Sequence, residues 1–278
     1  VLTMTRPGAA PGQSITVDRA MLTVRPGVRL SSSTLELSVR TSVSTSLRLT
    51  VPSATDVRAL TVDQVTRPLQ REGDEVVIAL QPGSHTVVLT WQESRGWDTA
   101  YETPRITLDH TVVNAELIVE GGADRWFLWV SGSGWGPAVL FWPYLALVLV
   151  LAFGLSRRRD LPPRPHDWAL LLVGLTQIHP VGALLVVGWF FVLESRKSTD
   201  IASPAWFALR QLFIIGYTLM TFGLMVWAVQ AGLLGDPQMS IQGPDCWDQH
   251  LRFFVDRSEG ELPTVTLLTL PVWVFRAL

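Results

Sequence analysis

The chain has 278 residues, of which 48% are hydrophobic and 17% are charged, and its formal net charge is -2. Soluble domains usually contain about 25% charged residues, so the depletion indicates that part of the chain is not an ordinary soluble domain. The charge balance excludes a nucleic-acid partner, because no basic surplus is present to neutralise phosphates. A single cysteine, Cys246, excludes an internal disulfide.

Residues 1–130 carry a strand pattern. The segments "SITVDRAMLTV", "TLELSVRT", "SLRLTVP", "DEVVIAL" and "HTVVLTWQ" alternate apolar and polar residues, which is typical of strands with one buried face. Pro26-Gly27, Gly73-Asp74 and Pro82-Gly83 mark turns between them. We therefore predict an all-β, antiparallel β-sandwich over 1–130, either as one domain or as a partial domain followed by a complete one.

This half contains one candidate binding loop and one candidate catalytic pair. Trp97 and Tyr101 lie in the polar stretch "RGWDTAYE", where exposed aromatic rings would form a binding loop, although such rings more often cover the end of a core. Asp109 and His110 are adjacent, but no nucleophile motif accompanies them. We therefore predict no catalytic residue.

A second module, residues 131–278, begins with an apolar run. Residues 137–155 have no charged side chain, and such a run of about 19 residues is roughly 28 Å long as a helix, enough to cross a bilayer core. Arg157, Arg158 and Arg159 follow at once and form a cytoplasmic charge anchor under the positive-inside rule. We therefore expect the protein to lie in a bacterial inner membrane, with residues 1–130 in the periplasm of a Gram-negative bacterium, or outside the cell otherwise.

Three stretches carry a resemblance at the level of overall pattern. They are "RLTVPSATDVRALTVDQVTRPLQREGDEVVIALQPGSHTVVLTW", "DRWFLWVSGSGWGPAVLFW" and "DWALLLVGLTQIHPVGALLVVGWFF". Together they resemble the C-terminal region of large uncharacterised proteobacterial inner-membrane proteins, which pair exported β-rich domains with a few transmembrane helices. The resemblance covers most of the chain and implies no known reaction.

Residues 206–234 form a second apolar span with no charge after Arg210. Small residues let helices approach closely in lipid, so Gly216, Gly223, Ala228 and Gly232 are candidates for a helix-packing face. Packing within the chain is the favoured explanation, and a partner subunit is the alternative.

Between the two spans, the apolar segment 168–193 is interrupted by Gln177, His179 and Pro180. Proline breaks a helix, and polar residues at membrane depth are candidates for function. Residues 156–167 carry four Arg, and Arg196 and Lys197 follow the segment. This charge pattern favours a re-entrant hairpin that returns to the cytoplasmic side; a single span kinked at Pro180 is the alternative.

Residues 236–262 form a predicted extramembrane loop, and 263–278 the start of a last span. In the loop, Asp245, Cys246, Asp248 and His250 are metal-ligand types, but they lack paired ligand spacing. We therefore predict no metal and no cofactor, and interpret the segment as amphipathic.

The functional expectation is a non-enzymatic anchor or assembly subunit of an envelope complex. The alternatives are a channel or transporter component that uses the 168–193 hairpin and, less favoured, a hydrolase or glycan-active enzyme. The chain starts at Val1 and stops within an apolar run, so we expect a piece of a longer polypeptide. Expected partners are the lipid bilayer, other membrane subunits and the rest of that polypeptide.

Overall fold

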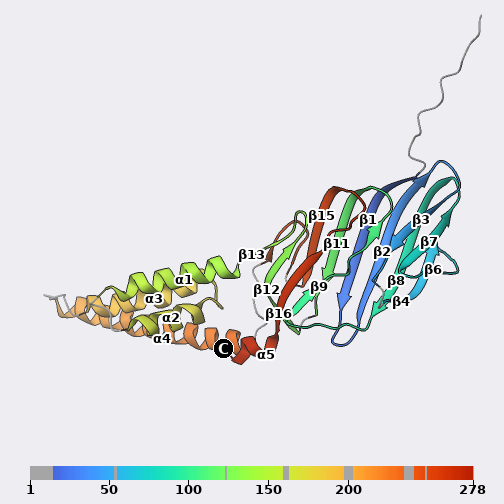
Figure 1. Ribbon diagram of the computed structural model, residues 1–278. Helices are drawn as coiled ribbons and strands as arrows, with labels where there is room; N and C mark the ends of the chain where they lie inside the picture. The colour runs from blue at the N-terminus through green and yellow to red at the C-terminus, as the bar shows by residue number, and fades with distance from the viewer. Residues whose placement is uncertain are drawn as a thin grey trace, which may run out of the picture. The chain divides into compact units, whose positions relative to one another are not determined.

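The computed structural model describes residues 15–52, 55–122, 124–158, 163–196, 203–234, 241–247 and 249–277 (Figure 1). It divides into two compact units. A β-rich unit contains Val1–Val139 together with Ile241–Leu270, and a helical unit contains Leu140–Ser240 together with Pro271–Leu278. The chain is therefore not a β domain followed by a helical domain, because the helices are inserted within the sequence of the β-rich unit.

The largest sheet has seven strands in the order β15-β11-β1-β2-β8-β4-β5. Its pairs are antiparallel, except that β1 and β11 run parallel. The purely antiparallel prediction is therefore corrected at this pair. Their bounds are β1 (Ile15–Pro26), β2 (Ser31–Thr41), β4 (Thr55–Val62), β5 (Val65–Thr66), β8 (Gly83–Glu93), β11 (Val112–Glu120) and β15 (His250–Ser258).

Three smaller sheets complete the β-rich unit. A four-stranded sheet contains β10 (Thr107–Leu108), β3 (Thr45–Thr50), β7 (Glu75–Leu80) and β6 (Gln70–Glu72), in that order. A three-stranded sheet contains β12 (Arg125–Gly132), β16 (Val265–Pro271) and β9 (Ala100–Glu102). The last is a short pair of β13 (Ala138–Val139) and β14 (Ile241–Gln242).

The core follows from the period-two pattern. In β2, Leu35, Leu37 and Val39 are fully buried, whereas Glu36 and Arg40 on the other face are exposed. Successive side chains of a strand point to opposite faces, so the alternation in the sequence becomes one buried and one solvated face. The prediction of a β-rich, mostly antiparallel first half is confirmed.

Residues 241–270 differ from the prediction of a loop and a last span. Strand β15 pairs with β11 from Val112–Ser258 to Glu120–His250, and β16 joins the three-stranded sheet. The stretch "HLRFFVDRS" buries Leu251 and Phe253 and leaves their neighbours more exposed. Apolar residues at every second position make strands, so the segment builds the β-rich unit, and only α5 (Val272–Ala277) is helical.

The helical unit contains α1 (Phe141–Ser156), α2 (Pro165–Leu175), α3 (Pro180–Ser195) and α4 (Pro204–Leu234) in addition to α5. The first apolar helix thus starts four residues later than predicted, because Ala138–Val139 form β13. Within the unit, Trp168 of α2 packs with Ala152 of α1, and Ala228 of α4 packs with Leu175, Ile178 and Val186.

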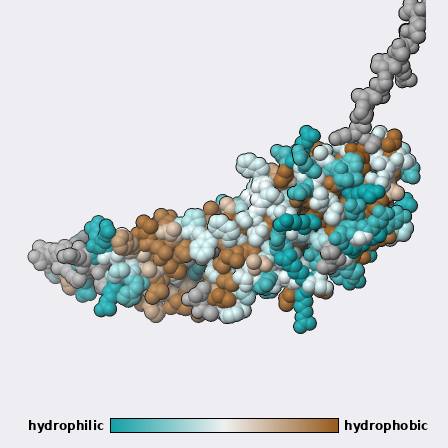
Figure 2. Space-filling view, viewed as in Figure 1, coloured by the Kyte–Doolittle hydropathy of each residue, from teal (hydrophilic) through white to brown (hydrophobic). Residues whose placement is uncertain are grey.

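One helix among the described residues, Pro204–Leu233 with a mean hydropathy of 2.0, is long and apolar enough to cross a membrane. Only 17% of its most apolar 18-residue window is buried. Large apolar side chains such as Leu212, Leu219 and Phe222 are each more than half exposed. Hydrophobic residues accordingly gather over the helical unit in the space-filling view (Figure 2).

Replacing Phe253 tests whether β15 belongs to the core. Phe253 is 3% exposed, whereas the adjacent Phe254 is only partly buried. Removing a buried Phe side chain leaves a cavity, so we expect Phe253→Ala to lower the free energy of unfolding by about 3–5 kcal/mol. The Phe254→Ala control should lose much less. Urea unfolding of the detergent-solubilised chain measures both, and equal losses would contradict the burial pattern.

Candidate functional site

The polar interruption at 177–180 is the turn between α2 and α3. His179 precedes α3 as its N-cap residue, and its Nδ1 accepts a hydrogen bond from the Val181 N–H at 3.3 Å. Pro180 is the first residue of the helix, where its missing N–H costs nothing. Gln177 Nε2 donates to Thr176 Oγ1 at 3.1 Å. The hydrogen bonds of Gln177 and His179 are therefore made within the turn between α2 and α3.

Contacts between α3 and α4 fix where this turn lies. Arg210 donates to the Ser195 carbonyl at 2.8 Å, and the Tyr217 hydroxyl donates to the Leu185 carbonyl at 2.6 Å. A Cβ at Gly232 would lie 3.7 Å from Gln177 Cγ. Helix α3 thus runs antiparallel to α4, and the turn lies beside the last part of α4. At 1.5 Å per residue it is roughly 33 Å from the level of Arg210, and so not at the centre of a span.

The four small residues of α4 do not form one packing face. Ala228 is 7% exposed and packs on the α2–α3 turn, and Gly232 lies beside Gln177. A Cβ at Gly216 or Gly223 would meet no atom within 4 Å among the described residues. Gly223 and Gly232 are nine residues apart, which at 3.6 residues per turn places them on opposite sides of the helix.

The arginines after α1 lie at its C-terminal end. Arg157 is the C-cap residue, and its guanidinium lies 4.6 Å from the centre of the Phe153 ring. Arg158 follows and donates its backbone N–H to the Leu155 carbonyl. Arg159 lies outside the described residues.

The predicted aromatic binding loop is wrong. Trp97 is 7% exposed and Tyr101 is 1% exposed. Their ring centres are 5.1 Å apart, and Trp97 also lies 5.8 Å from Phe127. Because these rings are packed into the core, they present no surface on which a sugar or a partner could stack.

A buried carboxylate lies next to this aromatic group. Glu93 ends β8 on the same face as Trp91, and it is 8% exposed. Its Oε1 accepts a hydrogen bond from Trp91 Nε1 at 3.0 Å. No described residue forms an ion pair with Glu93. Burying a carboxylate costs several kcal/mol unless a cation and hydrogen bonds compensate it, so Glu93 is a candidate for binding a cation from outside the chain.

Other polar groups surround this carboxylate. The Tyr101 hydroxyl donates to Ser31 Oγ at 3.2 Å, and the Ser31 hydroxyl donates to the Arg95 carbonyl at 2.5 Å. Burial raises the pKa of the Tyr101 hydroxyl; the hydrogen bond with Ser31 lowers it, and Glu93 and Arg95 make smaller contributions that raise and lower it respectively. Tyr101 therefore stays protonated at neutral pH.

Glu93 lines an open cavity of ≈ 500 Å³. Two other acids there are paired: Glu102 lies 2.7 Å from Arg105, and Asp74 lies 3.8 Å from Arg71. Arg95 also lines the cavity, with its guanidinium 5.2 Å from the centre of the Tyr101 ring. Within the described part of the chain, neither Glu93 nor Arg95 has an ion-pair partner. The cavity therefore offers one carboxylate and one guanidinium to a ligand.

Sequence reasoning missed Glu93, although a signal was present. In "HTVVLTWQE" the acid stands two residues after Trp91, which places it on the buried face of the strand by the same alternation that identified the strand. Because a glutamate is almost never fully buried unless it is paired, this position could have been identified as a candidate site.

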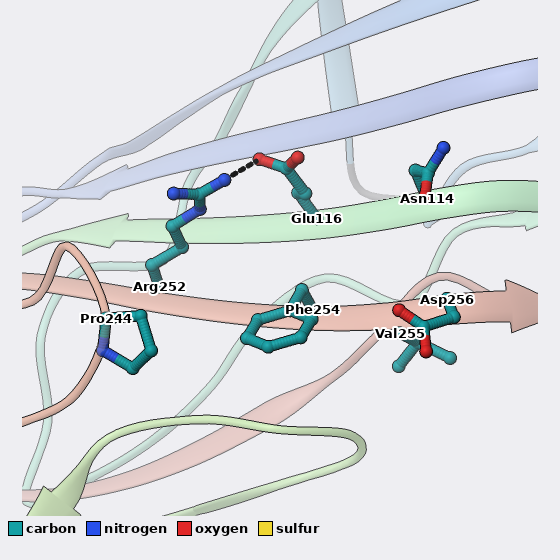
Figure 3. A pocket seen from close by; sticks show the side chains of 7 residues that line it. All are labelled: Asn114, Glu116, Pro244, Arg252, Phe254, Val255 and Asp256. Atoms are coloured by element: carbon teal, nitrogen blue, oxygen red, sulfur yellow. Dashed lines mark hydrogen bonds and ion pairs between the residues drawn. The ribbon is translucent and has the colours of Figure 1, made fainter.

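A second cavity of ≈ 240 Å³ lies over β11 and β15 (Figure 3). Its central carboxylate, Glu116, accepts hydrogen bonds from Arg19 at 3.2 Å and from Arg252 at 3.1 Å. Arg252 also pairs with Asp245. These ion pairs connect β1, β11 and β15, although Arg252 Nε is buried without a hydrogen-bond partner among the described residues.

The residues weighed as metal ligands make other contacts. Asp245 pairs with Arg252, whose backbone N–H donates to Cys246 Sγ at 3.3 Å. The His250 ring stacks on Trp247 with ring centres 4.0 Å apart. Asp248 lies outside the described residues. Across the described ranges, no group of three or more His, Cys, Asp or Glu residues is placed to hold a metal ion.

Two histidine–carboxylate pairs lie on the β-rich unit. His110 Nδ1 is 2.6 Å from Asp109 Oδ1, and His85 Nδ1 is 2.7 Å from Asp63 Oδ2. His85 Nε2 also lies 2.8 Å from the Gln81 carbonyl. In the described residues, no Ser, Thr or Cys side chain is hydrogen-bonded to either imidazole, so neither pair forms a nucleophile–base arrangement.

No protein-family model and no curated protein sequence matches the chain. Solved structures that it matches include an M1 zinc metallopeptidase of Deinococcus radiodurans, at 12% identity and a TM-score of 0.32, over 44% of this chain and 35% of that one. Another is aminopeptidase A of Legionella pneumophila, at 14% identity and a TM-score of 0.32, over 45% of this chain and 18% of that one.

These matches correct the expectation of a non-enzymatic anchor or a channel component. The matched proteins are metallopeptidases and an aminopeptidase, which are neither anchors nor channels. The chain spans little more than a third of the first protein's length and less than a fifth of the second's. A likeness at this TM-score assigns neither their activity nor a zinc site to this chain.

The His85–Asp63 pair predicts a pH dependence of stability. The hydrogen bond that His85 donates to the Asp63 carboxylate raises the pKa of His85 above 6.5 and lowers the pKa of Asp63 below 3.8. The His85 contribution is complete below its unfolded pKa and is lost as pH rises through the folded value; the Asp63 contribution is present above about pH 4 and is lost on acidification.

We therefore expect the unfolding free energy that depends on His85 to decrease between about pH 5.5 and about pH 8, by less than about 1 kcal/mol because the pair is partly solvated. His85→Gln should flatten this part of the profile. Urea unfolding at the two pH values, with His110→Gln as the matched variant, measures it. An unchanged profile in His85→Gln would assign the dependence to other groups.

Proposed function

We propose that the chain is a membrane-embedded protein whose β-rich unit binds the cationic group of a ligand, an amine or a guanidinium, at Glu93. The single observation that carries the binding proposal is a buried carboxylate that lines an open cavity and forms no ion pair with any described residue. A ligand cation there would supply the missing charge and remove most of the cost of burying the carboxylate.

Arg95 adds a second requirement. Its guanidinium lines the same cavity and is held over the Tyr101 ring, where a cation is attracted to the face of the ring. A ligand that places a carbonyl or carboxylate oxygen near its cationic group would contact both residues. The cavity therefore favours small zwitterionic or peptide-like ligands over apolar ones.

The helical unit is proposed to lie in a bacterial inner membrane, with the lipid bilayer as its partner. The exposed apolar side chains of α4 support this, because water disfavours such a surface and lipid does not. Trp142 and Tyr144 near the start of α1 suit an interface, and Arg157 and Arg158 at its end suit the cytoplasmic side. The β-rich unit would then be periplasmic, as in the proteobacterial membrane proteins that the sequence resembles.

Titration with a simple diamine tests the binding site. We expect cadaverine to bind the detergent-solubilised chain and 1,5-pentanediol, which has the same carbon chain without charge, not to bind. Glu93→Gln should abolish cadaverine binding because it removes the charge and keeps the acceptor for Trp91. Isothermal titration calorimetry measures both compounds.

The matched control is Glu36→Gln, which removes one negative charge from an exposed position of the same unit. It should leave cadaverine binding unchanged. Without ligand, Glu93→Gln should raise the unfolding free energy by about 1 kcal/mol, since a buried charge is replaced by a neutral acceptor. Equal cadaverine binding by the wild type and by Glu93→Gln would refute the site.

A pair of arginines in α4 tests the membrane location. Leu219 and Phe222 are exposed near the middle of α4, and Leu30 and Leu69 are exposed on the β-rich unit. An Arg at the centre of a membrane helix costs about 2.5–3.5 kcal/mol, so L219R/F222R should reduce the amount of chain in carbonate-washed membranes. L30R/L69R should not. Wild-type recovery of both variants would show that α4 faces water.

A further inference from the structure

The β-rich unit is built from chain on both sides of the helical unit. Strand β11 ends at Glu120, before α1, and its partner β15 begins at His250, after α4. Strand β14 pairs with β13, and β16 lies between β12 and β9. One folded sheet cannot be divided by a bilayer, so residues 15–139 and 241–270 lie on the same side of any membrane that the helices cross.

This sets the parity of the crossings. The chain leaves the β-rich unit at Val139 and re-enters it at Ile241, so the number of crossings between these residues must be even. Helix α4 is the long apolar helix, and the shorter apolar helix α1 supplies the matching crossing. If α1 crosses from the periplasmic to the cytoplasmic side and α4 crosses back, α2 and α3 together make no net crossing. We infer that α2 and α3 form a hairpin that enters and leaves the membrane from the side opposite the β-rich unit.

The inference rests on the membrane location in the proposed function. It excludes a single kinked span over 168–193, the alternative left open by the sequence. With α1 and α4 crossing, a third net crossing would place Ile241–Leu270 on the opposite side from Val1–Val139. Strand β15 would then be separated from β11, and all the hydrogen bonds of that pair would be lost.

Packing inside the helical unit supports the hairpin independently. Trp168, near the start of α2, packs with Ala152, near the end of α1. Ser195, the last residue of α3, contacts Arg210, near the start of α4. The end of α3 therefore lies where α4 begins, and the start of α2 lies beside the end of α1 and the last turns of α3, so α2 and α3 run antiparallel. The turn, with Ile178 against Ala228, lies at the other end of α4.

Charge agrees with this arrangement. Arg157, Arg158, Arg164, Arg196 and Arg210 all lie at or near these helix ends, which the positive-inside rule assigns to the cytoplasm. The turn is roughly 33 Å along α4 from Arg210, close to the thickness of a bilayer core. His179 and Gln177 then lie at the periplasmic interface, where water can satisfy the groups that a broken helix leaves open.

Single cysteines in a Cys246→Ser background test the topology in cells whose outer membrane is made permeable. A membrane-impermeant maleimide is added before and after the inner membrane is opened. We expect Ser44→Cys and Glu259→Cys, both on the β-rich unit, to be labelled before opening. Ser156→Cys and Arg196→Cys should lose this labelling and react only after opening. His179→Cys should react before opening.

Labelling of Arg196→Cys and Ser156→Cys on different sides would overturn the hairpin, as would different sides for Ser44→Cys and Glu259→Cys. Protection of His179→Cys before opening would contradict the position of the turn at the periplasmic interface. Failure of the membrane proposal itself looks different, because the wild-type chain would then be absent from carbonate-washed membranes. Cadaverine binding is measured on the solubilised chain, so its outcome is separate from both.

Discussion

The pairing of β11 with β15 is the constraint on which the rest of the structure depends. It joins Val112–Glu120 to His250–Ser258, and an unpaired β11 would leave the parallel β1–β11 pair at an open sheet edge. The chain between β11 and β15 forms a long loop, but the entropy cost of closing a loop grows only slowly with its length. The helices within the loop pack on one another and so reduce the length of flexible chain that must be closed. Glu116 adds to the pair by binding Arg19 of β1 and Arg252 of β15.

The unit handles its charges in two ways. Most are paired at the surface, as in Arg25–Glu120 at 2.6 Å and Arg40–Asp18 at 2.5 Å, where a pair contributes about 0–1 kcal/mol and mainly fixes geometry. Glu93 is different because it is buried beside Trp91 and has no described cation. Burying a carboxylate that has no ion-pair partner costs free energy, which is why we propose Glu93 as the ligand-binding residue.

Much of the fold could be predicted from local patterns, and the errors share a cause. Period-two alternation predicted β1, β2, β3, β7 and β8, because the buried face of each strand is visible in its own sequence. It missed β4, in which the alternation is irregular. The same alternation in Ile241–Leu270 was hidden by its apolar composition, so a strand such as β16 was read as the start of a span. The parallel β1–β11 pair could not be predicted, since nothing in either strand specifies a partner almost 100 residues away. At the candidate site, Trp97 and Tyr101 were expected in solvent because their neighbours are polar, and Glu93 was missed because strands were read for their apolar positions only.

The order of the strands along the chain also gives the fold an order in time. On a ribosome that adds about 5–20 residues per second, β15 follows β11 by roughly ten seconds. Four helices are synthesised in that interval. Until β15 is synthesised, β11 has no partner on one side, so the nascent β-rich unit has an unpaired sheet edge at β11. The β-rich unit can therefore be completed only after the helices between its two parts have been inserted. A chain in which this insertion fails keeps the unpaired edge of β11 exposed, where quality-control proteases and chaperones can recognise it.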